Sequence, residues 1–224
     1  MNPSFRRGLR DGAVLFVAIG AFGTAFGVLA VQAGLDRWLT VLASLIVISG
    51  AAQFTMAGLL ASGAAPVLVA TTGLALRHIP MSARLAELIG PRPLRTRIAM
   101  AWILVDETFG MALHVTERGE EDIVSYKAGT DMLLYSGWVG GTALGAMLGD
   151  SIDPERWGID VFFPLVFLGL AAPLVRKARD WFVAGVAVAS AIAATYVLPE
   201  AWQITGAATV AATAGAMLWR GPDA

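Results

Sequence analysis

The chain has 224 residues, of which 57% are hydrophobic and only 15% are charged, and its mean hydropathy is +0.68. Soluble domains carry about 25% charged residues, so this composition predicts an integral membrane protein. The formal net charge of −1 gives no reason to expect nucleic acid as a partner. The absence of cysteine excludes disulfides, thiolate catalysis and cysteine-ligated metal sites.

Apolar runs follow one another along the whole chain. Arg6, Arg7 and Arg10 precede the first run, which is too long for the core of a signal peptide, so we interpret it as a retained span. The sequence predicts an all-α, polytopic integral membrane protein with about seven or eight hydrophobic segments in one transmembrane domain, residues 1–224. Membrane lipid is the expected surrounding. The runs lie at about 13–34, 38–60, 64–89, 98–115, 131–149, 159–175, 181–198 and 204–219.

The third segment holds residues that are costly in lipid. Arg77 and His78 stand side by side after an uncharged apolar run, and Pro80 follows them. A cation near the bilayer centre costs about 2.5–3.5 kcal/mol on insertion scales. Proline removes a backbone donor and clashes with the preceding turn. We therefore expect this helix to be broken between Leu76 and Ser82, and the break to serve a functional site.

Other polar groups within the predicted segments have to be compensated as well. Asp106 and Glu107 lie in the middle of the fourth segment, and we expect at least one of them close to Arg77. Residues 116–127 are acidic and are expected outside the hydrocarbon. Gln53, in the second segment, either makes an interhelical hydrogen bond or lines a pathway. The candidate substrate-binding or proton-coupling residues are Arg77, His78, Asp106, Glu107 and Gln53; no metal or cofactor is expected.

The two halves of the chain share a pattern. The run Gly23-Thr24-Ala25-Phe26-Gly27 matches Gly141-Thr142-Ala143-Leu144-Gly145. This match and three further ones, given at the end of the paragraph, predict a duplicated unit at about residues 13–115 and 129–220. Such repeats are common in transporters. If the third segment spans, the repeats are parallel and the arginines of the following loop are outside. If it is re-entrant, the repeats are inverted and those arginines are inside. Further matches are Asp36-Arg37-Trp38 with Glu155-Arg156-Trp157, Gly50 with Gly169, and Pro80 with Pro199.

Small residues within these segments predict close helix packing. Glycines four residues apart let two helices approach closely in lipid. We expect the faces Gly23/Gly27 and Gly141/Gly145 to lie near each other at the centre of the bundle. Gly50 is a further packing position, and Pro80 marks the helix break.

These motifs together resemble the AzlC-type branched-chain amino acid permease family. The resemblance implies a polytopic helical permease that acts with a small four-span AzlD-type partner to export branched-chain amino acids or their analogues. Two positions depart from the family pattern and bear on substrate identity: Ala75, where Asn is common, and Pro80-Met81, where Leu-Tyr is usual. The matching pieces are Phe22-Gly23-Thr24-Ala25-Phe26-Gly27, Gly50-Ala51-Ala52-Gln53-Phe54, Leu76-Arg77-His78 and Asp106-Glu107, with Tyr135, Trp138, Gly141, Thr142 and Gly145 in the second half.

The leading hypothesis is secondary transport of a small amino acid, without enzymatic activity. Arg77 would hold the carboxylate in a two-pronged contact. Asp106 or Glu107 would hold the ammonium or the coupling proton, and His78 would relay that proton. The plainer alternative is that Arg77 and a carboxylate only neutralise each other.

Two other classes stay open. One is a membrane-embedded enzyme that uses Asp106, Glu107 and His78, although the sequence has neither a glycine-flanked nucleophilic serine nor an HExxH metal pair. The other is a non-transporting subunit that scaffolds a partner.

Overall fold

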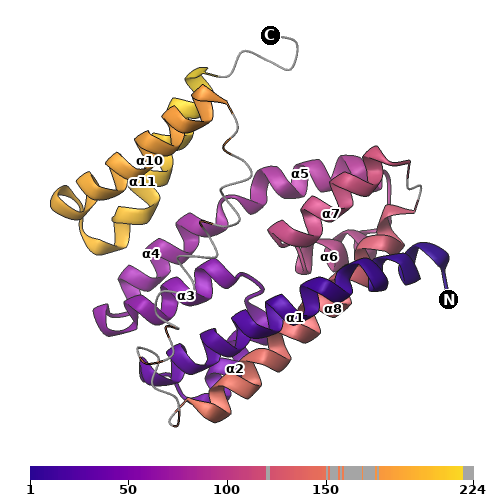
Figure 1. The fold of residues 1–224 in the computed structure, drawn as a ribbon, viewed down its shortest axis with the longest axis horizontal. Helices are drawn as coiled ribbons and strands as arrows, with labels where there is room; N and C mark the ends of the chain where they lie inside the picture. Colours follow the sequence, from indigo (N-terminus) through magenta and orange to yellow (C-terminus); the bar gives the residue numbers. More distant parts are fainter. Residues whose placement is uncertain are drawn as a thin grey trace. The chain divides into compact units, whose positions relative to one another are not determined.

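The structure, a computed structural model, describes residues 1–119, 122–149, 151, 156, 158, 168, 175 and 177–218, without the side chain of Ala201. Unit 1 comprises Met1–Gly58 and Ala75–Asp153, and unit 2 comprises Leu59–Leu74 and Pro154–Ala224. All regular structure in the described residues is helical, as predicted (Figure 1). The sixth segment, apart from residues 168 and 175, and the repeat positions Glu155, Trp157 and Gly169 lie outside the described residues.

Two long helices, α1 (Pro3–Gln32) and α8 (Ile123–Leu148), form the centre of unit 1 and lie side by side along most of their length (Figure 1). Residue numbers in contact rise together: Gly8 lies against Tyr126, and Gly149 lies against Val31. The two helices are therefore parallel, and both begin at the same end of the unit.

Glycine lets these two helices pack backbone against backbone. A Cβ atom at Gly23 would collide with the carbonyl oxygen of Trp138, and one at Gly141 would collide with that of Gly20. Gly27 and Gly145 are in the same situation. The structure thus brings the two predicted glycine faces together. Such close approach is the main source of helix association in lipid, where apolar burial drives little.

Three of the predicted segments are each split into two helices. The split of the third segment was expected, whereas the splits of the second and fourth correct the prediction that these are continuous helices. The pairs are α2 (Arg37–Ile46) with α3 (Gly50–Leu59), α4 (Ala64–Ala75) with α5 (His78–Ile89), and α6 (Leu94–Trp102) with α7 (Asp106–Glu117).

Pro80 lies in the first turn of α5, just after the break at Leu76 and Arg77. In an unbroken helix, proline at this position would leave the Leu76 carbonyl without its donor. Here the N–H of Ile79 donates to that carbonyl over 3.1 Å. A proline in the first turn of a helix removes no helical hydrogen bond, because the N–H groups there have no helical partner.

The other two breaks contain neither glycine nor proline. Residues 47–49 and 103–105 are mostly β-branched, and Val47 and Val105 have extended backbone conformations. Branching at Cβ lowers helix propensity only slightly. The sequence signal for these breaks is therefore weak, which explains why the prediction missed them.

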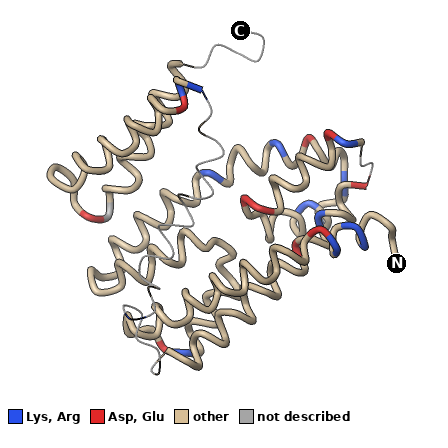
Figure 2. The backbone as a smooth tube through the Cα atoms, in the orientation of Figure 1, with Lys and Arg blue, Asp and Glu red and all other residues tan. Residues whose placement is uncertain are grey.

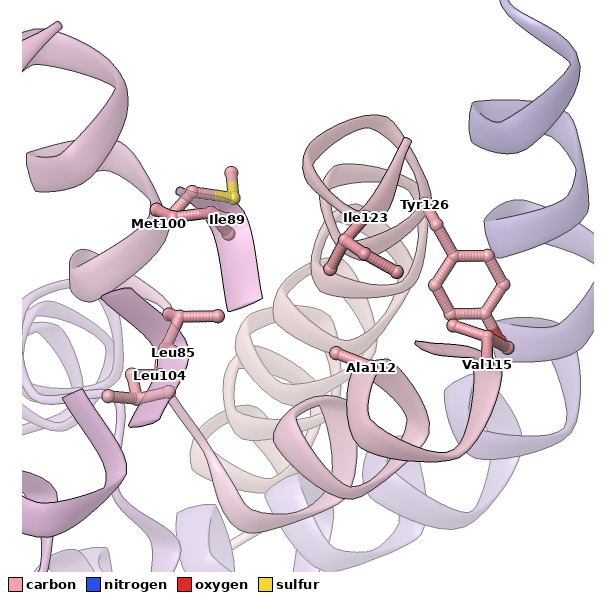
Figure 3. Close-up of a cluster of buried hydrophobic side chains, with 8 residues drawn as sticks. All are labelled: Leu85, Ile89, Met100, Leu104, Ala112, Val115, Ile123 and Tyr126. Atoms are coloured by element: carbon pink, nitrogen blue, oxygen red, sulfur yellow. The ribbon is translucent and has the colours of Figure 1, made fainter. Parts of the chain in front are cut away.

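The helix α7 runs antiparallel to α8 and returns to the end where α8 begins. A buried hydrophobic cluster joins α5, α6, α7 and α8 there (Figure 3). Much of the charge of unit 1 gathers at the same end (Figure 2). Hydrogen bonds from Ser125 hold the pKa of Asp122 below its usual range, helped by the nearby charge of Arg92. The cluster consists of Leu85, Ile89, Met100, Leu104, Ala112, Val115, Ile123 and Tyr126.

Unit 2 contains an antiparallel helical hairpin, α10 (Ala178–Val197) and α11 (Glu200–Leu218), which correspond to the predicted seventh and eighth segments. Ser190 of α10 donates to the carbonyl of Ala207 in α11 over 3.3 Å. Among the described residues, two helices, α1 and α10, are long and apolar enough to cross a membrane.

We predict that Gly23→Leu and Gly141→Leu each abolish stable expression. Leucine would force two backbones apart, which costs at least about 3 kcal/mol, the upper part of the usual range for overpacking. The measurement is the monodisperse yield in size-exclusion chromatography. Gly140→Leu is the matched control, because Gly140 has open space around its Cβ position and should tolerate leucine. Parent-like yield for both buried-face variants would contradict the prediction.

Candidate functional site

Arg77 lies where three helix breaks meet. Its Nη2 atom is 3.4 Å from Oδ2 of Asp106 and 3.5 Å from Oγ of Ser49. Ser49 directly precedes α3, Arg77 directly precedes α5, and Asp106 is the first residue of α7. The N-terminal ends of three helices therefore come together around one guanidinium group.

This arrangement is electrostatically positive. The N-terminus of a helix carries about half a positive charge and presents N–H groups that have no helical partner. Asp106 and Glu107 in the first turn of α7 are therefore well placed to offset this charge. Glu107 is also within electrostatic reach of Arg77. The site favours anionic groups, whether these carboxylates or a bound ligand.

The Arg77–Asp106 pair leaves hydrogen-bonding capacity unused. The side chains of Arg77 and Asp106 are 34% and 53% exposed, so the pair is open on one side. The Nε atom of Arg77, in contrast, is buried and has no hydrogen-bond partner among the described residues. Buried guanidinium donors normally have partners, so this N–H group is available to a ligand or to water.

His78 acts locally in the structure. Its Nδ1 atom is 3.0 Å from the carbonyl oxygen of Ala75, the last residue of α4. The ring thus covers a carbonyl that the break leaves without a helical donor. The role of His78 in relaying a proton stays a prediction.

Gln53 lies on α3, one turn after the break, but its side chain points into a buried network. It is 1% exposed; its Nε2 donates to Ser44 over 2.9 Å, and its Oε1 accepts from Trp138 over 2.8 Å. Ser44 in turn is 2.9 Å from the hydroxyl of Thr142. These bonds connect α2, α3 and α8, which favours the packing alternative for Gln53.

The side chain of Trp138 is the centre of the apolar packing beside this network. Its ring stacks on Phe26 of α1 with centroids 6.0 Å apart and meets Phe54 of α3 edge to face at 6.3 Å. A Cβ atom at Gly50 would be only 3.1 Å from the Trp138 ring. Gly50 thus occupies a packing position, where its lack of a side chain lets the indole cover the start of α3.

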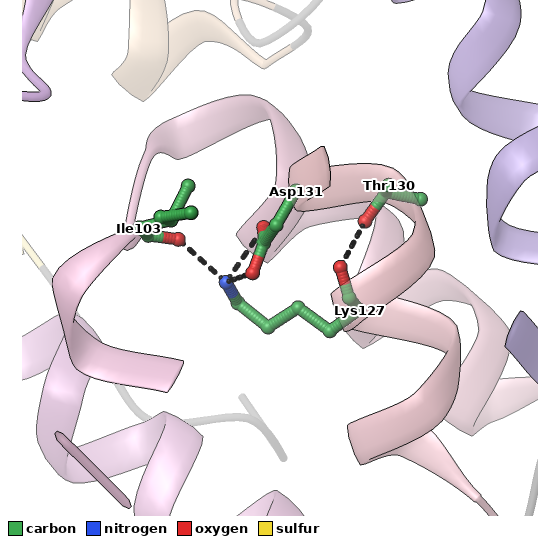
Figure 4. A network of polar contacts seen from close by, with 4 residues as sticks. All are labelled: Ile103, Lys127, Thr130 and Asp131. Atoms are coloured by element: carbon green, nitrogen blue, oxygen red, sulfur yellow. Dashed lines mark hydrogen bonds and ion pairs between the residues drawn. The ribbon is translucent and has the colours of Figure 1, made fainter. Parts of the chain in front are cut away.

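Two charged residues near the site were missed by the sequence analysis. Lys127 and Asp131 are buried on α8, which begins two turns before its predicted start. Lys127 is therefore a buried helical residue and not part of a solvated loop, and its place outside the hydrocarbon stays a prediction. The Nζ atom of Lys127 donates to both carboxylate oxygens of Asp131 and to the carbonyl of Ile103 (Figure 4). The four-residue spacing of opposite charges was the available signal, but the acidic loop before it suggested a solvated region.

The regular structure of the described residues is helical, and its helices expose many apolar side chains, as expected of a helical membrane protein. The sequence profile of the AzlC protein family matches residues 14–152. The chain belongs to this family. Membership indicates a membrane transport-related role, since proteins of this family are generally transporter components.

Relatives of the chain are membrane proteins. An uncharacterized membrane protein of Archaeoglobus fulgidus is 32% identical over 74% of this chain and 71% of its own length. The inner membrane protein YgaZ of Escherichia coli is 28% identical over 67% of this chain and 63% of its own. A membrane protein of Helicobacter pylori J99 is 25% identical over 70% of this chain and 69% of its own. No solved structure matches the chain significantly.

We predict that Gln53→Leu lowers the free energy of unfolding by about 1–2 kcal/mol, because two interhelical hydrogen bonds in a membrane protein contribute about this much. Thermal unfolding in detergent measures the loss. Gln203→Leu is the control, since the amide of Gln203 donates only to a backbone carbonyl at the surface. An unchanged melting temperature together with loss of transport would instead support a role of Gln53 in the pathway.

Proposed function

We propose that the chain is the permease subunit of a secondary transporter that exports branched-chain or related small amino acids across the bacterial cytoplasmic membrane. The observation that carries this proposal is the meeting of three helix N-termini around Arg77, beside Asp106. Many transporters bind the carboxylate of their substrate at the N-terminal ends of discontinuous helices. Family membership supports transport as the general role.

An α-amino acid offers groups that complement this site. Its carboxylate would bind the guanidinium of Arg77, whose buried Nε is unpaired among the described residues, and the N–H groups at the start of α7. Its ammonium would bind Asp106 or Glu107. At 3.4 Å the Arg77–Asp106 contact is looser than a charge-assisted hydrogen bond of about 2.7–2.9 Å. A zwitterion inserted between the two side chains would satisfy both charges.

The parallel packing of α1 and α8, which carry the matching glycine runs, supports a parallel orientation of the two repeats. It does not support the form in which the third segment spans and the following arginines lie outside, because Arg92 lies at the end of unit 1 where α1 begins. We propose that α6 and α7 form a re-entrant segment, because α7 returns along α8 to the end where α6 begins. In this topology Arg92 and the arginines at the start of α1 share one side of the membrane, which suits the positive-inside rule. The closeness of Arg92 to Asp122, which itself bonds Asn2, supports this reading.

We further propose that a small four-span AzlD-type protein is the partner subunit, on the strength of the family resemblance. Flux measurements should therefore use the chain both alone and coexpressed with such a partner. A chain that supports flux in neither setting, but binds the partner, would favour the scaffold alternative.

We predict that Arg77→Ala folds in good yield and loses flux of radiolabelled leucine in proteoliposomes. The partial exposure of the pair keeps the cost of breaking it below the about 3–5 kcal/mol typical of a fully buried ion pair. Because the guanidinium would contact the substrate, Arg77→Ala/Asp106→Ala should not recover flux. Arg84→Ala is the matched control: Arg84 lies on α5, the helix that directly follows Arg77, and its 2.6 Å pair with Glu87 is exposed.

Recovery of flux in the double variant would show that the pair serves only to neutralise charge. Unchanged flux in Arg77→Ala would count against both roles. Valine and isoleucine, tested in the same way, would define the substrate class.

A further inference from the structure

The Lys127 ammonium group connects two parts of unit 1. Its side chain has no exposed surface, and its Nζ is 2.7 and 2.8 Å from the two carboxylate oxygens of Asp131, one turn further along α8. Nζ also lies 2.6 Å from the carbonyl oxygen of Ile103, in the break between α6 and α7 (Figure 4). An ammonium has three N–H donors and no acceptor. These contacts therefore use the whole group.

The contact with Ile103 satisfies a carbonyl that the break would otherwise leave without a donor. In a continuous helix this carbonyl would accept from the N–H of Glu107, but the backbone of Val105 is extended and α7 begins only at Asp106. A carbonyl left unpaired in lipid is costly. Lys127 replaces the lost helical donor with a charged one, which is the stronger kind of hydrogen bond.

This contact also fixes the segment that carries Asp106. Only Leu104 and Val105 separate Ile103 from Asp106, and both are buried, so the segment has little room to move. Asp106 in turn lies 3.4 Å from Arg77. A chain of direct contacts therefore runs from Asp131 through Lys127 and the α6–α7 break to the candidate site.

An ion pair between residues four apart on one helix would form without the contact between Nζ of Lys127 and the carbonyl of Ile103. Such pairs contribute little at a surface, and burying one often stabilises no more than apolar packing would. A role confined to α8 does not explain why Nζ also contacts the carbonyl of Ile103 in the α6–α7 break.

We infer that Lys127 is a positioning residue of the substrate site. Its ammonium holds the α6–α7 break so that α7 presents Asp106 to Arg77, and Asp131 holds that ammonium in position through two hydrogen bonds. An effect of Lys127 on substrate binding rests on the proposed function. The role of Lys127 in holding the α6–α7 break rests only on the contacts of Lys127 itself.

The absence of cysteine from the chain makes a direct test possible, because spin labels attach only at introduced cysteines. Gly110→Cys in α7 and Gly140→Cys in α8 are suitable positions, since a Cβ atom at either glycine would have open space around it. Pulsed electron paramagnetic resonance then gives the distribution of α7–α8 distances. It is measured in the labelled parent, Lys127→Arg, Lys127→Met and Lys127→Met/Asp131→Leu.

The parent and Lys127→Arg should give one narrow distribution, because both keep a cation at the break. Lys127→Met strands the Asp131 carboxylate and should lose folded yield. Lys127→Met/Asp131→Leu should recover the yield but keep a broadened or shifted distribution. In that variant leucine affinity, measured by isothermal titration calorimetry, should fall about tenfold, as expected when contacting neighbours are uncoupled.

A parental distance distribution in the double variant would overturn the inference, because the pair would then serve only the stability of α8. Failure of the double variant to fold would overturn it as well, since a group that only positions the break is not required for folding. If the parent neither binds nor transports leucine, the proposed function fails for that substrate, and the distance distributions still decide the role of Lys127.

Discussion

Lipid cannot hydrogen-bond to the backbone, and the rest of this structure depends on that constraint. Every break in a membrane helix leaves N–H and C=O groups that must find partners within the protein. Here the carbonyl of Ala75 lies against His78, that of Leu76 accepts from Ile79, and that of Ile103 accepts from Lys127. These three carbonyl groups are thus covered, while the starts of α3, α5 and α7, whose first N–H groups have no helical partner, come together around Arg77. The asymmetry gives the site its preference for anions.

The helix α8 serves both the rigid and the interrupted parts of unit 1. Its glycines lie against α1, where backbone contact leaves no room for adjustment. From the same helix, Lys127 reaches the α6–α7 break, and Trp138 and Thr142 join the network that holds α2 and α3. Two of the three breaks are therefore held by contacts with one rigid helix, α8. These contacts explain how irregular segments can keep a defined geometry.

Much of this arrangement was predictable from the sequence, and the exceptions have physical reasons. Pro80 predicted the break in the third segment because proline by itself removes a backbone hydrogen-bond donor. The spacing of the glycines predicted the contact between α1 and α8. The breaks at 47–49 and 103–105 rest on β-branched residues, which are common in unbroken membrane helices. Lys127 was missed because a charge beside an acidic loop has the same sequence context whether it is solvated or buried. Only its contact with Ile103, distant in sequence, distinguishes the two cases.

The parallel contact between α1 and α8 also has a consequence for biosynthesis. The hydrogen bond between Asn2 and Asp122 joins residues 120 positions apart. At about 5–20 residues per second, roughly 6–24 s pass between the synthesis of these two residues. During that interval the glycine face of α1 is in the membrane without the helix that covers it. The centre of unit 1 therefore assembles late, after every interrupted helix between α1 and α8 has been made, and α8 is the element that completes it.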